Sequence, residues 1–235
     1  MTFSAFTTAT LAALCLLSVP ASAATYQFTG ANYVAPSIAN FTPPCSLGVC
    51  ADYTTSMRVT GQFSTAAPLA ANLTNADIYP QVTSFQFSDG VNNYQSAAPG
   101  VRPSRFQVTT NALGEVTGSD IIIGAWQDNL AGPHAAGNRH NVVSVTSFAG
   151  VVGNNNVCTG VVAGSLVPDT CVAGSDGNSS VVTGVGGSWT TLATPVANIR
   201  PCPSGRCCCW PGWWAWQPAP ALFRRAVAAS RAPVG

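Results

Sequence analysis

The stretch that decides the fold is VTSFQFSDG, residues 82–90. Phe85 and Phe87 alternate with polar residues, which is typical of a strand with one face on a core. The following Asp-Gly pair has turn chemistry, because glycine adopts the positive φ that tight turns require. Short alternating runs of this kind recur between residues 24 and 199, separated by clusters of Gly, Pro, Asn, Asp and Ser. The pattern predicts an all-β fold, an antiparallel β-sandwich of jelly-roll type with short turns.

Two hairpins are expected within this sandwich. The first joins residues 106–110 to 116–123 across the Gly114 region, and the second turns at GNNN, residues 153–156. Ile121-Ile122-Ile123 is a continuous apolar run, which predicts a central strand covered on both faces. The other strands are predicted at residues 26–30, 53–63, 82–88, 141–152, 157–162 and 187–192.

The composition of the 235-residue chain indicates one core-forming domain with two appendages. Hydrophobic residues make up 47% of the chain and charged residues only 7%, and lysine is absent. Residues 24–199 contain four Arg and eight acidic residues, whereas residues 200–235 contain five Arg and no acidic residue. A body so poor in cations argues against nucleic-acid binding, which requires clustered Lys and Arg.

Residues 1–23 have the pattern of a secretory signal peptide. An apolar helix-forming run from Ala9 to Val19 is followed by Pro20 and by the small-residue sequence Ala21-Ser22-Ala23. We therefore expect signal peptidase to cleave between Ala23 and Ala24, and the domain at 24–199 to be exported to an oxidising compartment.

Three segments carry a resemblance to a known family. YTTSMRVTGQFSTAAPLAANL at 53–73, SFQFSDG at 84–90 and the hairpin with Gly114 and Trp126 resemble the PEP-CTERM exported proteins of proteobacteria, which are sorted by exosortase. The resemblance covers most of residues 24–199. It implies export and, for the family, sorting to the bacterial cell surface, and it supplies no reaction. For this chain the expected location is secreted or cell surface, and the tail described next predicts release rather than anchoring.

Residues 200–235 form a Trp-, Cys- and Pro-rich tail that is expected to have no fold of its own. When the reading frame is shifted by two nucleotides, the codons of Cys207-Cys208-Cys209-Trp210 encode Leu-Leu-Leu. The last base of the Trp210 codon and the first two bases of the Pro211 codon then encode Ala. The members of the resembled family carry Pro-Glu-Pro, an apolar helix and an Arg cluster at this place. We interpret the tail as an out-of-frame sorting signal, so exosortase is an expected partner only where that signal is in frame.

The body contains four cysteines, which allow three pairings. Proximity in the sequence favours Cys45–Cys50 and Cys158–Cys171 as disulfides. A four-cysteine metal site is disfavoured, because no two of these cysteines have the C-x₂-C spacing of zinc sites.

No strong catalytic motif is present. Asp128, His134 and His140 follow one another at intervals of six, but metal ligands on one strand or helix are expected two to four residues apart, so two solvated loop histidines are the preferred interpretation. The G-x-S-x-G motif of serine hydrolases is absent from the sequence. We expect no cofactor, no bound metal and no catalytic residue.

Two function classes follow from these patterns. The preferred one is an exported, non-enzymatic surface or extracellular-matrix-associated protein that meets exopolysaccharide or the cell surface. The alternative is a carbohydrate-binding module or weak glycan hydrolase, in which Tyr79, Tyr94 and Trp126 stack on sugar rings.

Overall fold

The computed structural model describes residues 22–41, 47–162, 166–175 and 178–192. All of them belong to one compact unit, Met1–Val196. The predicted signal helix and the tail at 200–235 lie outside the described residues. Among the described residues, no helix is long and apolar enough to cross a membrane.

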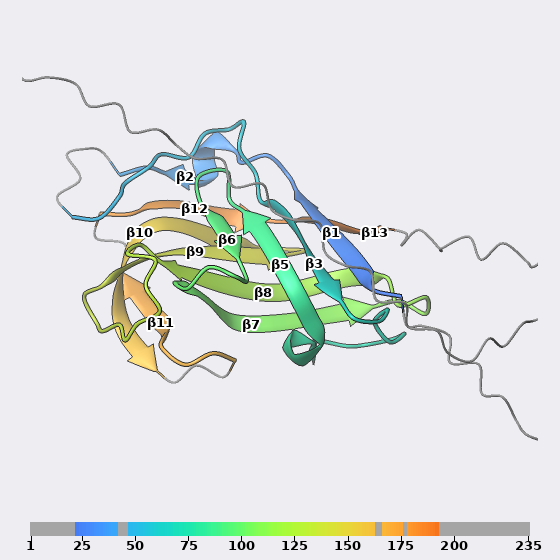
Figure 1. Cartoon of the computed structure of the whole chain (residues 1–235). Coiled ribbons are helices and arrows are strands. Elements are labelled where there is room, and N and C mark those ends of the chain that lie inside the picture. The colour runs from blue at the N-terminus through green and yellow to red at the C-terminus, as the bar shows by residue number, and fades with distance from the viewer. Residues whose placement is uncertain (1–21, 42–46, 163–165, 176–177, 193–235) are drawn as a thin grey trace, which may run out of the picture. The chain divides into compact units, whose positions relative to one another are not determined.

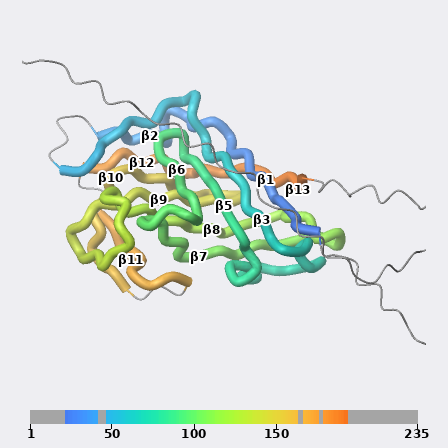
Figure 2. Tube along the Cα trace, in the orientation of Figure 1, coloured from blue at the N-terminus to red at the C-terminus, as the bar shows by residue number. Residues whose placement is uncertain are grey.

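The first of two sheets has five antiparallel strands in the order β13-β1-β3-β5-β6. β1 and β13 pair side by side although they come from opposite ends of the described chain (Figure 2). The strands of this first sheet are β1 (Ala24–Gly30), β3 (Thr60–Thr65), β5 (Val82–Ser88), β6 (Asn93–Gln95) and β13 (Gly187–Leu192).

The second sheet lies behind the first and has the order β2-β12-β10-β9-β8-β7-β4, with β11 paired to β10 (Figure 1). Short 3₁₀ turns occur at Ala35–Ser37 and Tyr79–Gln81. The predicted all-β sandwich is therefore confirmed. The strands of the second sheet are β2 (Ile38–Ala39), β4 (Ala76–Asp77), β7 (Val101–Thr110), β8 (Val116–Trp126), β9 (Arg139–Thr146), β10 (Gly150–Val162), β11 (Thr170–Ser175) and β12 (Ser180–Val185).

The core between the sheets is aromatic on one side and aliphatic on the other. Phe63 of β3 is fully buried, and its ring lies 4.9 Å from that of Tyr26, 5.4 Å from that of Phe106 and 5.3 Å from that of Trp189. Such ring pairs add attraction beyond the burial of apolar surface. The second sheet contributes mainly the branched aliphatic side chains Val108, Ile121, Ile123, Val143, Val145 and Val152.

The glycine at Gly61 allows this aromatic layer to close. A Cβ atom there would lie 2.5 Å from a ring carbon of Phe87 and 2.3 Å from the carbonyl oxygen of Gln86. Gly61 also pairs with Phe28 of the neighbouring strand. Its lack of a side chain therefore leaves room for the two flanking phenylalanine rings.

The hairpin predicted at residues 153–156 is wrong. β10 runs through this segment, and the chain turns instead at residues 147–149. The pairing of β10 with β9 shifts between Gly153 and Asn156, and Asn155 has a φ of 62°. The asparagines therefore form a bulge within a strand, held by side-chain hydrogen bonds described below.

Two further expectations need correction. The strand predicted at 53–63 begins only at Thr60, because Tyr53 is held in a loop by hydrogen bonds to and from the side chain of Asn40, both 2.9 Å long. Ile121 and Ile123 face the core as predicted, but Ile122 is only half-buried and faces an open groove. The outer face of β8 is therefore only partly covered.

The aromatic core predicts a sharp contrast between two phenylalanines. Phe63→Ala should lower the free energy of unfolding by about 3–5 kcal/mol, because it leaves a cavity among three rings. Phe148→Ala is the matched control, since Phe148 is 83% exposed, and it should change stability by no more than about 0.5 kcal/mol. Urea unfolding followed by tryptophan fluorescence measures both. Equal losses for the two variants would contradict the packing described.

Candidate functional site

The outer face of the first sheet carries no charged side chain, since its five strands contain no Asp, Glu, Lys or Arg. Alternation sends the aromatic residues inward and leaves hydroxyl and amide side chains outside. We call this outward set the polar array. The strand register aligns it in two cross-strand rows, Thr190–Gln27–Gln62–Gln86–Gln95 and Ser188–Thr29–Thr60–Ser88–Asn93.

The polar array is open to solvent. Its members are exposed except Ser88, which is half-buried. A shallow depression of 340 Å³ lies over its centre, between Gln27, Gln62 and Gln86. Because amide groups both donate and accept hydrogen bonds, and neighbouring strands lie ~4.8 Å apart, the array offers regularly spaced partners of both kinds.

A second feature, the amide cleft, adjoins the array at β6. It has a volume of 430 Å³ and shares Asn93 and Gln95 with the array. On its other side it is lined by Gln127, Asn129 and Asn141 from the second sheet and the loop after β8. The array and the cleft thus form one continuous uncharged polar surface.

An amide network fixes the wall of this cleft. The Asn141 side-chain N–H donates to Asn92 Oδ1 at 3.0 Å, and Asn154 donates to the same oxygen at 3.3 Å. Gln127 donates to Asn141 Oδ1 at 3.0 Å. It also accepts a hydrogen bond from the backbone N–H of Val49 at 2.8 Å and donates one to the Val49 carbonyl oxygen at 3.0 Å. The network therefore holds the loop at Val49 against β8, β9 and β10.

The network ends on a buried carboxylate, Asp89. This side chain is fully buried at the end of β5 and accepts hydrogen bonds from the hydroxyls of Tyr53 and Tyr94, at 3.0 and 2.9 Å. The side chain of Asn92 donates to it at 2.9 Å, and the backbone N–H groups of Val91 and Asn92 donate at 2.8 and 2.6 Å. Burial, and then the charge of Asp89, raises the pKa of Tyr53 and of Tyr94 above the ordinary value.

A separate cluster surrounds His134. Its ring is 2% exposed, and its two nitrogens contact Asp169 Oδ2 and, at 3.1 Å, Asp128 Oδ1. The ring of Trp126 stacks on it with centroids 4.3 Å apart, and Arg102 lies 3.8 Å from Asp169. This cluster joins the loop after β8 to the segment before β11.

The two carboxyl groups in this cluster have pKa values below the ordinary one. Burial alone would raise the pKa of Asp169, but hydrogen bonds from His134 and the charge of Arg102 outweigh it. The pKa of Asp128 is lowered first by the backbone N–H of Leu130 and then by His134. Both groups therefore favour the folded state as anions.

The structure corrects the sugar-stacking hypothesis. Tyr94 is fully buried and Trp126 is 4% exposed, with one face covered by His134, so neither ring presents a face to a ligand. Tyr79 is half-buried and packs 6.1 Å from the ring of Phe106. Tyr94 and Trp126 therefore belong to the packed interior, as aromatic residues in a sandwich commonly do, whereas Tyr79 lines a surface pocket.

The expectation of two solvated loop histidines is also wrong. His134 is covered by Trp126, and His140 lies in β9 and is 7% exposed. Of the predicted sequence Asp128, His134, His140, the structure brings together only the first two. The third member of that cluster is Asp169, which is remote in sequence and carries no motif that could have marked it.

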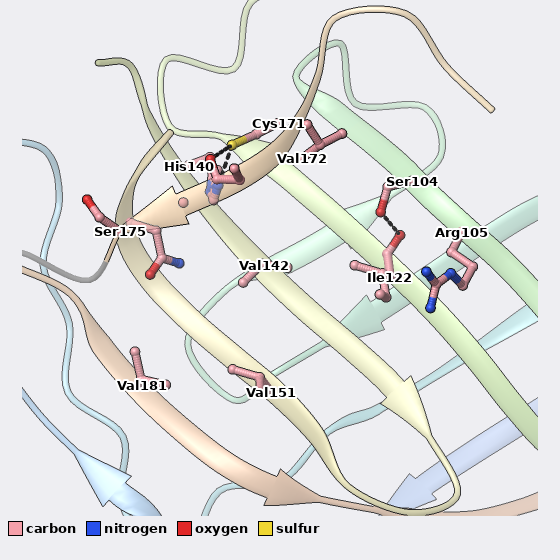
Figure 3. A pocket seen from close by; sticks show the side chains of 13 residues that line it. Ser104, Arg105, Ile122, His140, Val142, Val151, Cys171, Val172, Ser175 and Val181 are labelled. Carbon is pink, nitrogen blue, oxygen red and sulfur yellow. Dashed lines mark hydrogen bonds between the residues drawn. The ribbon is translucent and has the colours of Figure 1, made fainter. Parts of the chain in front are cut away.

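His140 lies instead at one end of a groove on the outer face of the second sheet (Figure 3). The groove has a volume of 670 Å³, is bordered by β11, and has Val142, Val151 and Val181 on its floor. His140 Nε2 lies 2.9 Å from Cys171 Sγ. Burial lowers the pKa of His140 to about 4, so its ring is neutral at pH 7.

The predicted Cys158–Cys171 disulfide is confirmed. Cys50 is also disulfide-bonded, and Cys45, its predicted partner, lies outside the described residues. At the predicted signal cleavage site, Ala23 is exposed and Ala24 is the first residue of β1. The described residues therefore hold one of the two predicted cysteine pairs in full.

Comparison with protein-family models, with curated proteins and with solved structures finds no match. The geometry of the polar array, the amide cleft and the two histidine sites therefore carries the functional argument.

The His134 cluster predicts a specific response to acid. Because the pKa of Asp169 is lowered in the folded state, its stabilisation is present above its unfolded pKa of ~3.9 and is lost as the pH falls through the folded value. Asp169→Asn should therefore lower the free energy of unfolding at pH 7 by about 1–2 kcal/mol. It should also make the decline below pH ~4 shallower than in the parent protein.

Urea unfolding at several pH values measures this response. Asp120→Asn is the control, because Asp120 pairs with Arg105 at the surface, where ion pairs contribute at most about 1 kcal/mol. An Asp169→Asn variant with the parent's stability at pH 7 and the parent's acid profile would refute the anionic role of Asp169.

Proposed function

We propose that this protein is an exported, non-enzymatic surface or extracellular-matrix-associated protein that binds an uncharged polysaccharide along the polar array. The observation that carries the proposal is the pair of cross-strand rows of amide and hydroxyl side chains, on five strands without a charge. Such a face matches a ligand that offers many hydroxyl groups and no ionic group.

The chemistry of the array supports a neutral ligand. Each glutamine of the central row supplies two donors and an acceptor with two lone pairs, and each Thr or Ser hydroxyl does both. A sugar hydroxyl needs the same two functions. Because a single hydrogen bond exchanged with water contributes only ~1 kcal/mol, useful affinity requires many such contacts along an extended chain.

The amide cleft extends the polar array at one end and so indicates the path of a bound ligand chain. Asn93 and Gln95 belong to both surfaces, so a ligand chain lying across β1, β3 and β5 reaches the cleft at β6. There it meets Gln127, Asn129 and Asn141. The alternative of stacking on Tyr94 and Trp126 is replaced by hydrogen bonding to amides.

Export is supported by two independent features. The Cys158–Cys171 disulfide fits an oxidising compartment, and residues 1–23 have the pattern of a signal peptide. The resemblance to PEP-CTERM proteins points in the same direction and to a bacterial surface. Signal peptidase is the partner this proposal requires, and exosortase is a partner only where the sorting signal is in frame.

Substitution of the central row tests the proposal. Gln62→Ala combined with Gln86→Ala removes two exposed amides and should leave stability within about 0.5 kcal/mol of the parent. Binding to neutral polysaccharides should weaken at least tenfold, because two adjacent pairs of donors and acceptors are lost. A glycan array followed by titration calorimetry on the best ligand measures the change.

The matched control is Gln81→Ala, which removes an exposed glutamine from the 3₁₀ turn outside the array. It should bind like the parent. The proposal fails if the protein binds no neutral polysaccharide saturably, or if the double variant binds as tightly as the control.

A further inference from the structure

The end of the groove at β11 holds three potential metal ligands. The ligand atoms of His140, Cys158 and Cys171 all lie within 4.8 Å of one another. Zn–S bonds are ~2.3 Å and Zn–N bonds ~2.1 Å, so two ligand atoms on one tetrahedral zinc ion lie ~3.6–3.8 Å apart. Small side-chain rotations are therefore sufficient to place all three atoms around one ion.

We propose that reduction of the Cys158–Cys171 disulfide converts this end of the groove into a Zn²⁺ site, with the two thiolates and His140 Nε2 as ligands. A histidine and two cysteines form a ligand set that zinc favours, and they leave a fourth position open. His140 and Cys171 both line the groove, which gives an ion or a water molecule a path to the site.

The surroundings of the three residues agree with this assignment. Cys158 is fully buried and His140 nearly so, whereas Cys171 is half-buried and lines the groove. A reductant can therefore reach the Cys171 sulfur while the site stays enclosed on its inner side. Gly174 stands opposite Cys158 in β11, and even a Cβ atom there would be only 3.4 Å from His140 Cε1, so its missing side chain keeps the ring edge clear.

The oxidised site leaves polar atoms without partners, which is rare for buried groups. His140 Nδ1 has no hydrogen-bond partner among the described residues, and the side-chain nitrogen of Asn156, which lines the same groove, has none either. Coordination through Nε2, the nitrogen that faces Cys171 Sγ, places the ring proton on Nδ1.

The conversion balances in two steps. A dithiol donates two electrons and two protons to the Cys158–Cys171 bond, which breaks into two thiols while the dithiol becomes a disulfide. Zn²⁺ then displaces both thiol protons to solvent and accepts electron pairs from the two sulfurs and from His140 Nε2. The oxidised protein holds no such site, because its sulfurs are bonded to each other.

The test uses the full chain with serine at Cys15, Cys45, Cys50, Cys202 and residues 207–209, so that only the proposed cysteines remain. This parent is reduced with a phosphine and titrated with Zn²⁺ against a chromogenic chelator. Co²⁺ serves as a second probe, because thiolate-bound tetrahedral Co²⁺ has characteristic visible and charge-transfer absorption. We expect one ion per chain in the reduced parent and none in the oxidised parent.

Two variants assign the ligands. His140→Gln should weaken Zn²⁺ binding at least tenfold, whereas His134→Gln, which alters the other histidine, should bind like the parent. Cys171→Ser should lose affinity and most of the thiolate-to-cobalt absorption, and its fold is compared with that of the reduced parent by circular dichroism. The proposal is overturned if the reduced parent binds no stoichiometric metal, or if both the His140 and the Cys171 variants bind as the parent does.

Discussion

The burial of one carboxylate, Asp89, is the constraint on which the rest of the structure depends. A charge without access to water is costly unless hydrogen bonds replace its hydration. Two tyrosine hydroxyls and the side chain of Asn92 provide that replacement, together with backbone N–H groups. Tyr33 adds a bond of 2.7 Å to the Asp89 carbonyl oxygen, so the turn after β5 is held through its side chain and its backbone.

From Asp89 the same set of bonds crosses to the second sheet. The side-chain nitrogen of Asn92 donates a hydrogen bond to Asp89, and its side-chain oxygen accepts hydrogen bonds from Asn141 and Asn154. The bulge in β10 is a consequence, because Asn154 and Asn155 must turn toward Asn141 to complete the network. The amide cleft therefore depends on hydrogen bonds between the side chains of the turn after β5 and those at the bulge in β10.

The sequence predicts most of the first sheet and little of the network. The strand that contains Phe85 and Phe87 is predictable because these residues alternate with polar ones. The Cys158–Cys171 pair is predictable because the two cysteines are close in the sequence. Asn154 and Asn155 have the composition of a turn, and only partners far away in sequence keep them within a strand. His134 and Asp169 meet for the same reason: 35 residues separate them, and no spacing rule connects them. The lack of charged residues in these strands is visible in the sequence. The alignment of their polar side chains in two rows follows only from the strand register.

That absence of charge also sets the conditions under which the outer face of the first sheet can work. Ionic attraction at a protein surface weakens beyond the Debye length, about 8 Å at physiological ionic strength and 3 Å in 1 M salt. Amide and hydroxyl side chains have no net charge to screen, and they do not titrate between acid and mildly alkaline conditions. A face built from them keeps the same hydrogen-bonding character at low salt, at high salt and in mildly acidic solution. For the exported role proposed above, that constancy is a property that charged side chains would not provide.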